Sequence, residues 1–248
     1  MTETGPEPGA ALAGYWEIHC DATLQALVDG PTCPDLFRRT LTGYLSWHVR
    51  NRTTIERVLT TPSTAVAWFA AILALGAEVR VEGQGEVPVD AFLERRIKGR
   101  LEALHIPLPR PGAVPLEGVA WGEARVARTH SDEPIVSAVA VVEGGEPVVI
   151  RARLALTGAC SRPAGLAKAA AHLVGNPLTL DTIRDVATAV EAEVMPKGDF
   201  LGSTEYRRAM AGVMARRALE ECLAGHNTET GTGCAAHGSS TREGGHGR

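Results

Sequence analysis

The stretch from Trp47 to Ile55 reads WHVRNRTTI and carries the clearest fold signal in the chain; Glu56 and Arg57 follow it directly. On its N-terminal side, apolar residues recur every three or four positions over Pro34–Trp47, which predicts a helix. On its C-terminal side, Pro62 can occupy the first turn of a helix, and Ser63–Leu75 is apolar on every face. Such a helix is expected to be buried all round, and Gly76 is expected to end it.

The rest of the first half contains shorter elements. We expect strands where hydrophobic and polar residues alternate, and a break where prolines gather, because proline removes a hydrogen-bond donor from a helix or strand. The expected elements are a strand at Tyr15–Cys20, a helix at Ala22–Val28, a strand at Glu78–Glu82, a turn or helix at Asp90–Ile97, and a proline-rich linker at 105–118.

Strands come before helices in the second half, which predicts an α+β domain. Glu143–Glu146 (EGGE) is typical of a hairpin turn between two of these strands. The expected strands are Val119–Thr129, Ile135–Val142 and Val148–Gly158, and the expected helices are Pro163–Val174, Leu180–Met195 and Ser203–Leu223. We therefore expect a disordered lead (1–13), a first domain (14–104), the linker (105–118), a second domain (119–224) and a disordered tail (225–248).

Composition narrows the class of protein. The 248 residues carry a formal net charge of −4, so no basic excess indicates nucleic acid or an anionic membrane as a partner. No export signal is visible, and the longest apolar run is shorter than the roughly 20 residues that span a bilayer. The five cysteines include no C-x-x-C pair. Free thiols and a cytoplasmic location are therefore expected.

Three segments in order resemble one known family, the FAD-binding medium subunits of molybdenum hydroxylases, which include carbon monoxide and xanthine dehydrogenases. The segments are Trp47–Ile55, Leu73–Val79 (LALGAEV) and Asp199–Arg208 (DFLGSTEYRR), the last running into ARRAL at 215–219. The resemblance covers roughly residues 16–224. It implies a shortened flavin-type (PCMH-like) α/β domain followed by a C-terminal domain of three antiparallel strands and three helices. It also implies FAD contacts from Arg50, Asn51, Thr54 and Ile55.

The chain departs from the family where the flavin would bind. Family members have a Gly-Gly pair where this chain has Glu56 and Arg57. Glycine lets backbone N–H groups approach a phosphate, whereas a carboxylate adds bulk and a like charge. Arg57 can partly compensate as a phosphate partner. The family's earlier AGGTDL loop, which holds the FAD pyrophosphate, has no counterpart in residues 1–13. We therefore expect ordinary FAD binding to be weakened or lost, and the cofactor is either FAD or none.

Two functions of different classes remain open. In the first, the chain is a divergent medium subunit that associates with iron–sulfur and molybdopterin subunits and passes electrons through a flavin, or acts without one. In the second, it is a stand-alone isomerase, cyclase or binding protein of secondary metabolism that uses the former flavin cleft for a small organic ligand. A homo-oligomer is compatible with both.

Candidate catalytic residues are few. His48 could act as a general acid or base near neutral pH, although a histidine packed at a helix end is the favoured interpretation. Glu56 and Arg57 are the other candidates. Cys234 and His237 have zinc-like spacing but form only half a site, so no metal site is expected. The arginines of the last helix are expected on a solvated or subunit-docking face; they are Arg207, Arg208, Arg216 and Arg217.

Overall fold

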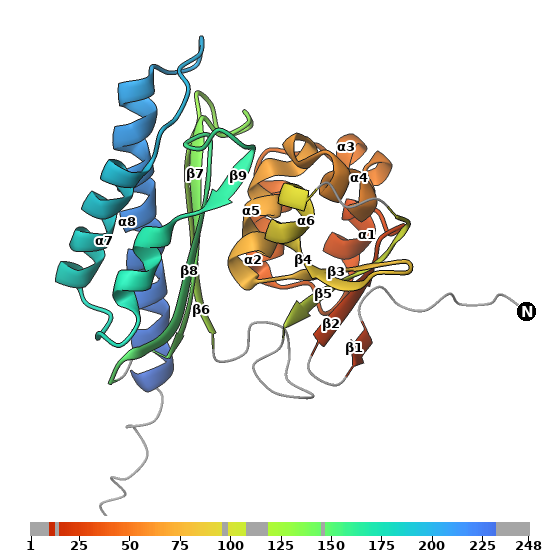
Figure 1. Cartoon of the computed structure of the whole chain (residues 1–248), viewed down its shortest axis with the longest axis horizontal. Coiled ribbons are helices and arrows are strands. Elements are labelled where there is room, and N and C mark those ends of the chain that lie inside the picture. Colours follow the sequence, from red (N-terminus) through yellow and green to blue (C-terminus); the bar gives the residue numbers. More distant parts are fainter. Residues whose placement is uncertain (1–9, 13–14, 96–98, 108–118, 145–146, 232–248) are drawn as a thin grey trace, which may run out of the picture.

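A computed structural model describes residues 10–12, 15–95, 99–107, 119–144 and 147–231. Two antiparallel sheets organise the molecule (Figure 1), and the first has the strand order β1-β2-β5-β3-β4. Its strands are β1 (Ala10–Leu12), β2 (Tyr15–His19), β3 (Glu78–Val81), β4 (Gly85–Pro88) and β5 (Leu101–Pro107). The helices of this half are α1 (Leu24–Asp29), α2 (Asp35–Thr42), α3 (Trp47–Arg52), α4 (Ile55–Thr60), the 3-10 helix η1 (Pro62–Ala65), α5 (Val66–Leu75) and α6 (Val89–Arg95).

The second sheet has the order β6-β7-β8-β9, and α7 and α8 lie along its outer face (Figure 1). Its strands are β6 (Val119–Val126), β7 (Val136–Gly144), β8 (Val149–Thr157) and β9 (Ala164–Leu166). The helices of this half are the 3-10 helix η2 (Lys168–Leu173), α7 (Leu180–Glu193) and α8 (Thr204–Gly231). No helix among the described residues is long and apolar enough to cross a membrane.

Helix α5 lies between the two sheets, which explains why it is apolar on every face. All ten of its residues are buried, and the core around it contains Val139 and Val141 of β7 as well as Ala155 of β8. The opposite face of the second sheet packs against α7 and α8 in a separate core. The central strand β7 is therefore buried on both faces over Val136–Val142.

Several sequence predictions are confirmed. Gly76 ends α5 in the left-handed conformation with φ 73°, and Pro62 occupies the first turn of η1. The three predicted strands of the second half form β6, β7 and β8, and Gly144 has the positive φ of 74° that the predicted hairpin requires. The α+β class is also confirmed.

Other predictions are wrong in identifiable ways. The expected helix at Pro34–Trp47 is two helices, because α2 ends at Thr42 and Ser46 caps a new helix by accepting a hydrogen bond from the Val49 N–H at 3.3 Å. The expected helix at Pro163–Val174 is strand β9 followed by η2, because Ala164–Leu166 pairs with β8. The second half thus has four strands, two α-helices and one 3-10 helix, not three strands and three helices.

The boundaries predicted for the linker, the lead and the tail also differ from those in the structure. His105–Pro107 belongs to β5, where Pro107 pairs with Tyr15 at the end of the strand; the rest of the predicted linker, 108–118, lies outside the described residues. Helix α8 continues to Gly231, so the expected disordered tail does not begin at Gly225. The disordered lead was predicted over 1–13, but Ala10–Leu12 forms β1 and pairs with β2. Residues 1–9 and the tail over 232–248 lie outside the described residues, as do Cys234 and His237.

Candidate functional site

The junction between α3 and α4 is held against residues 20–24 by the backbone. The N–H of Leu24 donates to the carbonyl of Thr53 at 2.9 Å, and the N–H of Ile55 donates to the carbonyl of Ala22 at 3.0 Å. Thr53 and Ile55 are buried. The C-terminal end of the segment Trp47–Ile55 is therefore fixed in the core, whereas α3 itself has no buried residue.

The first-turn N–H groups of α4 all have acceptors within the protein. The N–H of Glu56 donates to the carbonyl of Cys20 at 2.8 Å, and that of Val58 donates to the carbonyl of Thr54 at 3.2 Å. The hydroxyl of Thr54 caps the helix by accepting from the Arg57 N–H at 3.2 Å. Since Ile55 is paired as well, each of the four N–H groups from Ile55 to Val58 is engaged.

Three of the residues assigned to a cofactor by resemblance have structural partners instead. Nε of Arg50 donates to Oε1 of Gln25 at 2.8 Å, and its guanidinium also bonds the carbonyl of Leu45. The amide of Asn51 donates to the carbonyl of Trp47 at 2.9 Å. Ile55 is fully buried. Together with Thr54, these residues shape the junction, and their role toward a cofactor stays a prediction.

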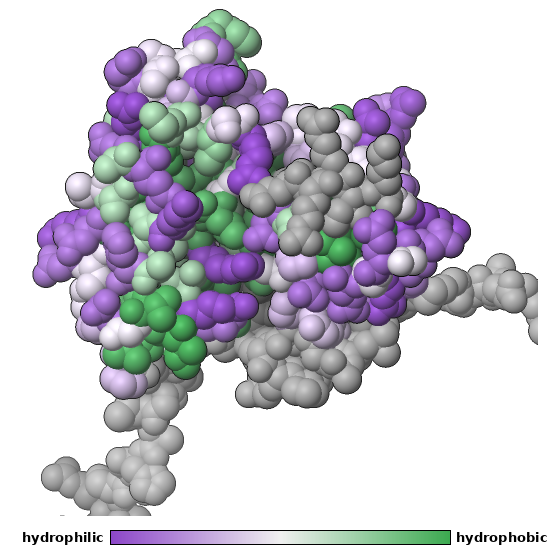
Figure 2. All heavy atoms as spheres, viewed as in Figure 1, coloured by the Kyte–Doolittle hydropathy of each residue, from purple (hydrophilic) through white to green (hydrophobic). Residues whose placement is uncertain are grey.

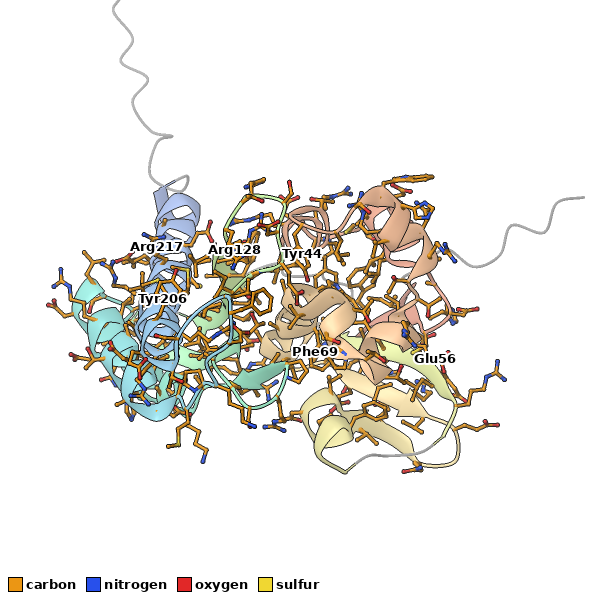
Figure 3. The ribbon with its side chains drawn as sticks, turned by 90° about the horizontal axis from the view of Figure 1, so that it is seen from above. Tyr44, Glu56, Phe69, Arg128, Tyr206 and Arg217 are labelled. Atoms are coloured by element: carbon orange, nitrogen blue, oxygen red, sulfur yellow. The ribbon has the colours of Figure 1, made fainter. Side chains whose placement is uncertain are left out.

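The three candidate catalytic residues are exposed. His48 lies on α3, and Glu56 and Arg57 lie in the first turn of α4. No hydrogen bond or ion pair joins His48 to the other two within the described chain. Glu56 lies at the end of the first half that is farthest from α8 (Figure 3). Burial, and then the carboxylates of Glu56 and Asp21, raise the pKa of the Cys20 thiol to about 12, so this thiol is protonated near neutral pH.

Arginines join the two halves of the molecule. Arg39 of α2 pairs with Glu221 of α8 at 2.7 Å and with Glu123 of β6 at 3.4 Å. Arg153 of β8 donates to the carbonyl of Leu73, at the C-terminal end of α5, at 3.3 Å. Sequence reasoning missed both, because nothing in the local pattern shows which helix end or carboxylate an arginine will reach.

Arg207 contradicts its predicted exposed position. It is 5% exposed and binds both carboxylate oxygens of Asp199 at 2.7 Å. The presence of both residues in the DFLGSTEYRR motif was the sequence signal that could have predicted this ion pair.

Among the described residues, no group of histidines, cysteines and carboxylates could hold a metal ion.

Comparisons with known proteins match this architecture. Residues 124–222 match the family model of the CO dehydrogenase flavoprotein C-terminal domain. The chain is 32% identical over 124 residues to the carbon monoxide dehydrogenase medium chain of Afipia carboxidovorans, covering 50% of this chain and 41% of the relative. It is 26% identical over 142 residues to that of Hydrogenophaga pseudoflava, covering 57% and 50%. The chain thus spans half or less of the length of these relatives.

Solved structures share the fold. The carbon monoxide dehydrogenase of Hydrogenophaga pseudoflava aligns with a TM-score of 0.74 and 24% identity over 87% of this chain and 77% of that one. The quinoline 2-oxidoreductase of Pseudomonas putida 86 aligns with a TM-score of 0.72 and 22% identity over 87% of this chain and 78% of that one.

Proposed function

We propose that the chain, which is similar to the medium chains of carbon monoxide dehydrogenase, serves as a medium-subunit-like component of a molybdenum hydroxylase assembly in which flavin binding is weakened or lost. Its partners would be an iron–sulfur subunit and a molybdopterin subunit. The matched C-terminal domain and the arginine contacts that tie it to the first half support a role as a rigid docking body.

The engaged N–H groups of α4 carry the flavin part of the proposal. The start of a helix attracts phosphate because its first N–H groups are unpaired and its dipole favours negative charge. Here the groups from Ile55 to Val58 already donate within the protein. Opening the N–H groups of Ile55 and Glu56 to a diphosphate would break the hydrogen bonds that they donate to the carbonyls of Ala22 and Cys20. The residues present at this segment therefore do not fit a diphosphate cradle.

Charge at the same turn adds to this misfit. The exposed Glu56 carboxylate stands in the first turn of α4, where it satisfies the helix dipole itself and repels another anion. Arg57 is adjacent and exposed, and it offsets part of that repulsion. We infer that the Glu56 carboxylate stabilises this turn in the place of a bound anion.

The assembly is tested by co-expression of the full chain with the molybdopterin and iron–sulfur subunits of a molybdenum hydroxylase. We expect a stoichiometric complex on size-exclusion chromatography, without flavin absorption from this subunit. A chain that elutes alone contradicts the assembly. A complex that carries one flavin per copy of this chain contradicts the loss of flavin binding and leaves the assembly intact.

A further inference from the structure

A phenylalanine is held in solvent at the tip of the second half. Phe200 is 84% exposed and belongs to the connection between α7 and α8, which projects beyond the upper end of both helices (Figure 1). The Arg128 guanidinium lies 5.6 Å from the centre of its ring and donates to its carbonyl at 3.2 Å. An exposed aromatic ring beside an arginine is the composition found at the energetic centre of protein interfaces.

The turn that carries Phe200 is rigid. The Asp199 carboxylate accepts from the N–H groups of Leu201 at 2.8 Å and Gly202 at 3.1 Å. The Arg207 guanidinium donates to that carboxylate, and it also donates to the carbonyls of Ile135 at 2.6 Å and Gly158 at 3.0 Å. The backbone on either side of Phe200 is therefore held in place, so little backbone entropy is lost when the ring is bound.

A pocket lies directly beside this turn. Its volume is about 310 Å³, and its walls include Val66, Pro134, Ile135, Pro163 and Leu201. Polar side chains, among them Arg162 and Arg207, line the rest of it. A cavity of about 150 Å³ is large enough for benzene, so the pocket has room for a phenyl ring against its apolar walls. Glu133 also lines the pocket. Burial raises the pKa of its carboxyl, and no arginine, lysine or histidine of the described segments lies within ion-pair distance of it.

We propose that this face forms a two-fold homodimer, in which Phe200 of each copy enters the pocket of the other. Ring and pocket share one rim because Asp199 and Leu201, on either side of Phe200, line the pocket. A two-fold interface needs a surface that complements itself, with contacts exchanged in both directions. In this arrangement the Arg128 guanidinium, which donates to the Phe200 carbonyl, meets the Glu133 carboxylate of the second copy, and the opposite charges attract across the interface. The dimer does not depend on the proposed function.

Sedimentation equilibrium on the full chain tests the ring. We expect a reversible dimer, and Phe200→Ser should weaken it by about tenfold or more. Ile150→Ser is the matched control, because Ile150 is 73% exposed but lies near the opposite end of β8. Figure 2 shows that hydrophobic side chains also gather at that lower end. A monomer at all concentrations, or a dimer that survives Phe200→Ser or is lost equally in Ile150→Ser, overturns the proposal.

A charge exchange tests the pairing of Arg128 with Glu133. Arg128→Glu and Glu133→Arg should each weaken the dimer, and the double variant should recover most of the lost affinity, because it restores opposite charges across the interface. A purely structural role of Arg128 in holding Phe200 would not be rescued by the second substitution. Failure of the double variant to recover, with thermal unfolding unchanged, overturns the assigned contact.

Discussion

Gly76 has a backbone conformation that favours glycine, and it lies close to an arginine side chain. Its φ of 73° lies in the left-handed region, and a Cβ there would overlap the Arg153 guanidinium. Gly83 has nearly the same φ, 74°, with open space around it. Gly83→Ala should lower the free energy of unfolding by about 1–2 kcal/mol, and Gly76→Ala should lower it more, as measured by urea denaturation. Equal losses would show that Arg153 does not constrain this site.

Asp199 contributes to the free energy of unfolding, and this contribution decreases at acidic pH. Hydrogen bonds from the Arg207 side chain and then from the Leu201 N–H hold the pKa of Asp199 below its ordinary value of 3.8. A carboxyl with a lowered folded-state pKa stabilises the fold above its unfolded pKa and loses that effect as pH falls through the folded pKa. The stability gap between wild type and Asp199→Asn should be constant from about pH 8 to pH 5 and should close below pH 3.8. A gap that widens in acid would contradict this.

Arg207 also shows where prediction from single residues ends. Four arginines in the last helix indicated a solvated face, and Arg207 is nevertheless buried. Helical spacing gives the direction of a side chain but not the path of the preceding turn, which brings Asp199 to the guanidinium. For the same reason, Arg50 and Asn51 could be singled out from the sequence, whereas their partners within the protein could not.

At the scale of elements, α5 is the best-predicted helix and the one on which both halves depend. Its unbroken apolar sequence predicted burial on every face, and the two sheets provide it. Ile72→Ala should lower the free energy of unfolding by about 2–5 kcal/mol, because a fully buried side chain leaves a cavity. Val49→Ala on α3, where Val49 is 38% exposed, should change it by less than about 0.5 kcal/mol. Similar small effects at both sites would contradict the burial of α5.

The elements that prediction missed depend on distant neighbours. Ala164–Leu166 is short and precedes alanines that favour a helix. It forms a strand because it pairs with the edge of β8. Strand β5 ends in a proline-rich sequence that predicted a linker, and it is stabilised by pairing with both β2 and β3. Long apolar runs and hairpin turns are readable locally, whereas short edge strands are set by the sheet that they join.

At the scale of the whole molecule, the two halves should unfold together. The core around α5 includes side chains from both sheets. Trp16 and Trp68 lie within it, and Trp121 of β6 packs against it, so tryptophan fluorescence reports on this core. The far-ultraviolet signal is dominated by helices, of which α7 and α8 are the longest described. Tryptophan fluorescence and circular dichroism should therefore give one coincident urea transition. Two separated transitions would contradict a continuous core.

We propose that this chain keeps the fold of its relatives but has no anion site at the start of α4. Titration of the purified full chain with FAD, followed by the fluorescence of the free flavin after equilibrium dialysis, tests this most directly. The engaged N–H groups from Ile55 to Val58 and the Glu56 carboxylate predict no saturable binding at micromolar FAD. Stoichiometric binding with a dissociation constant of about 1 μM or tighter would contradict it.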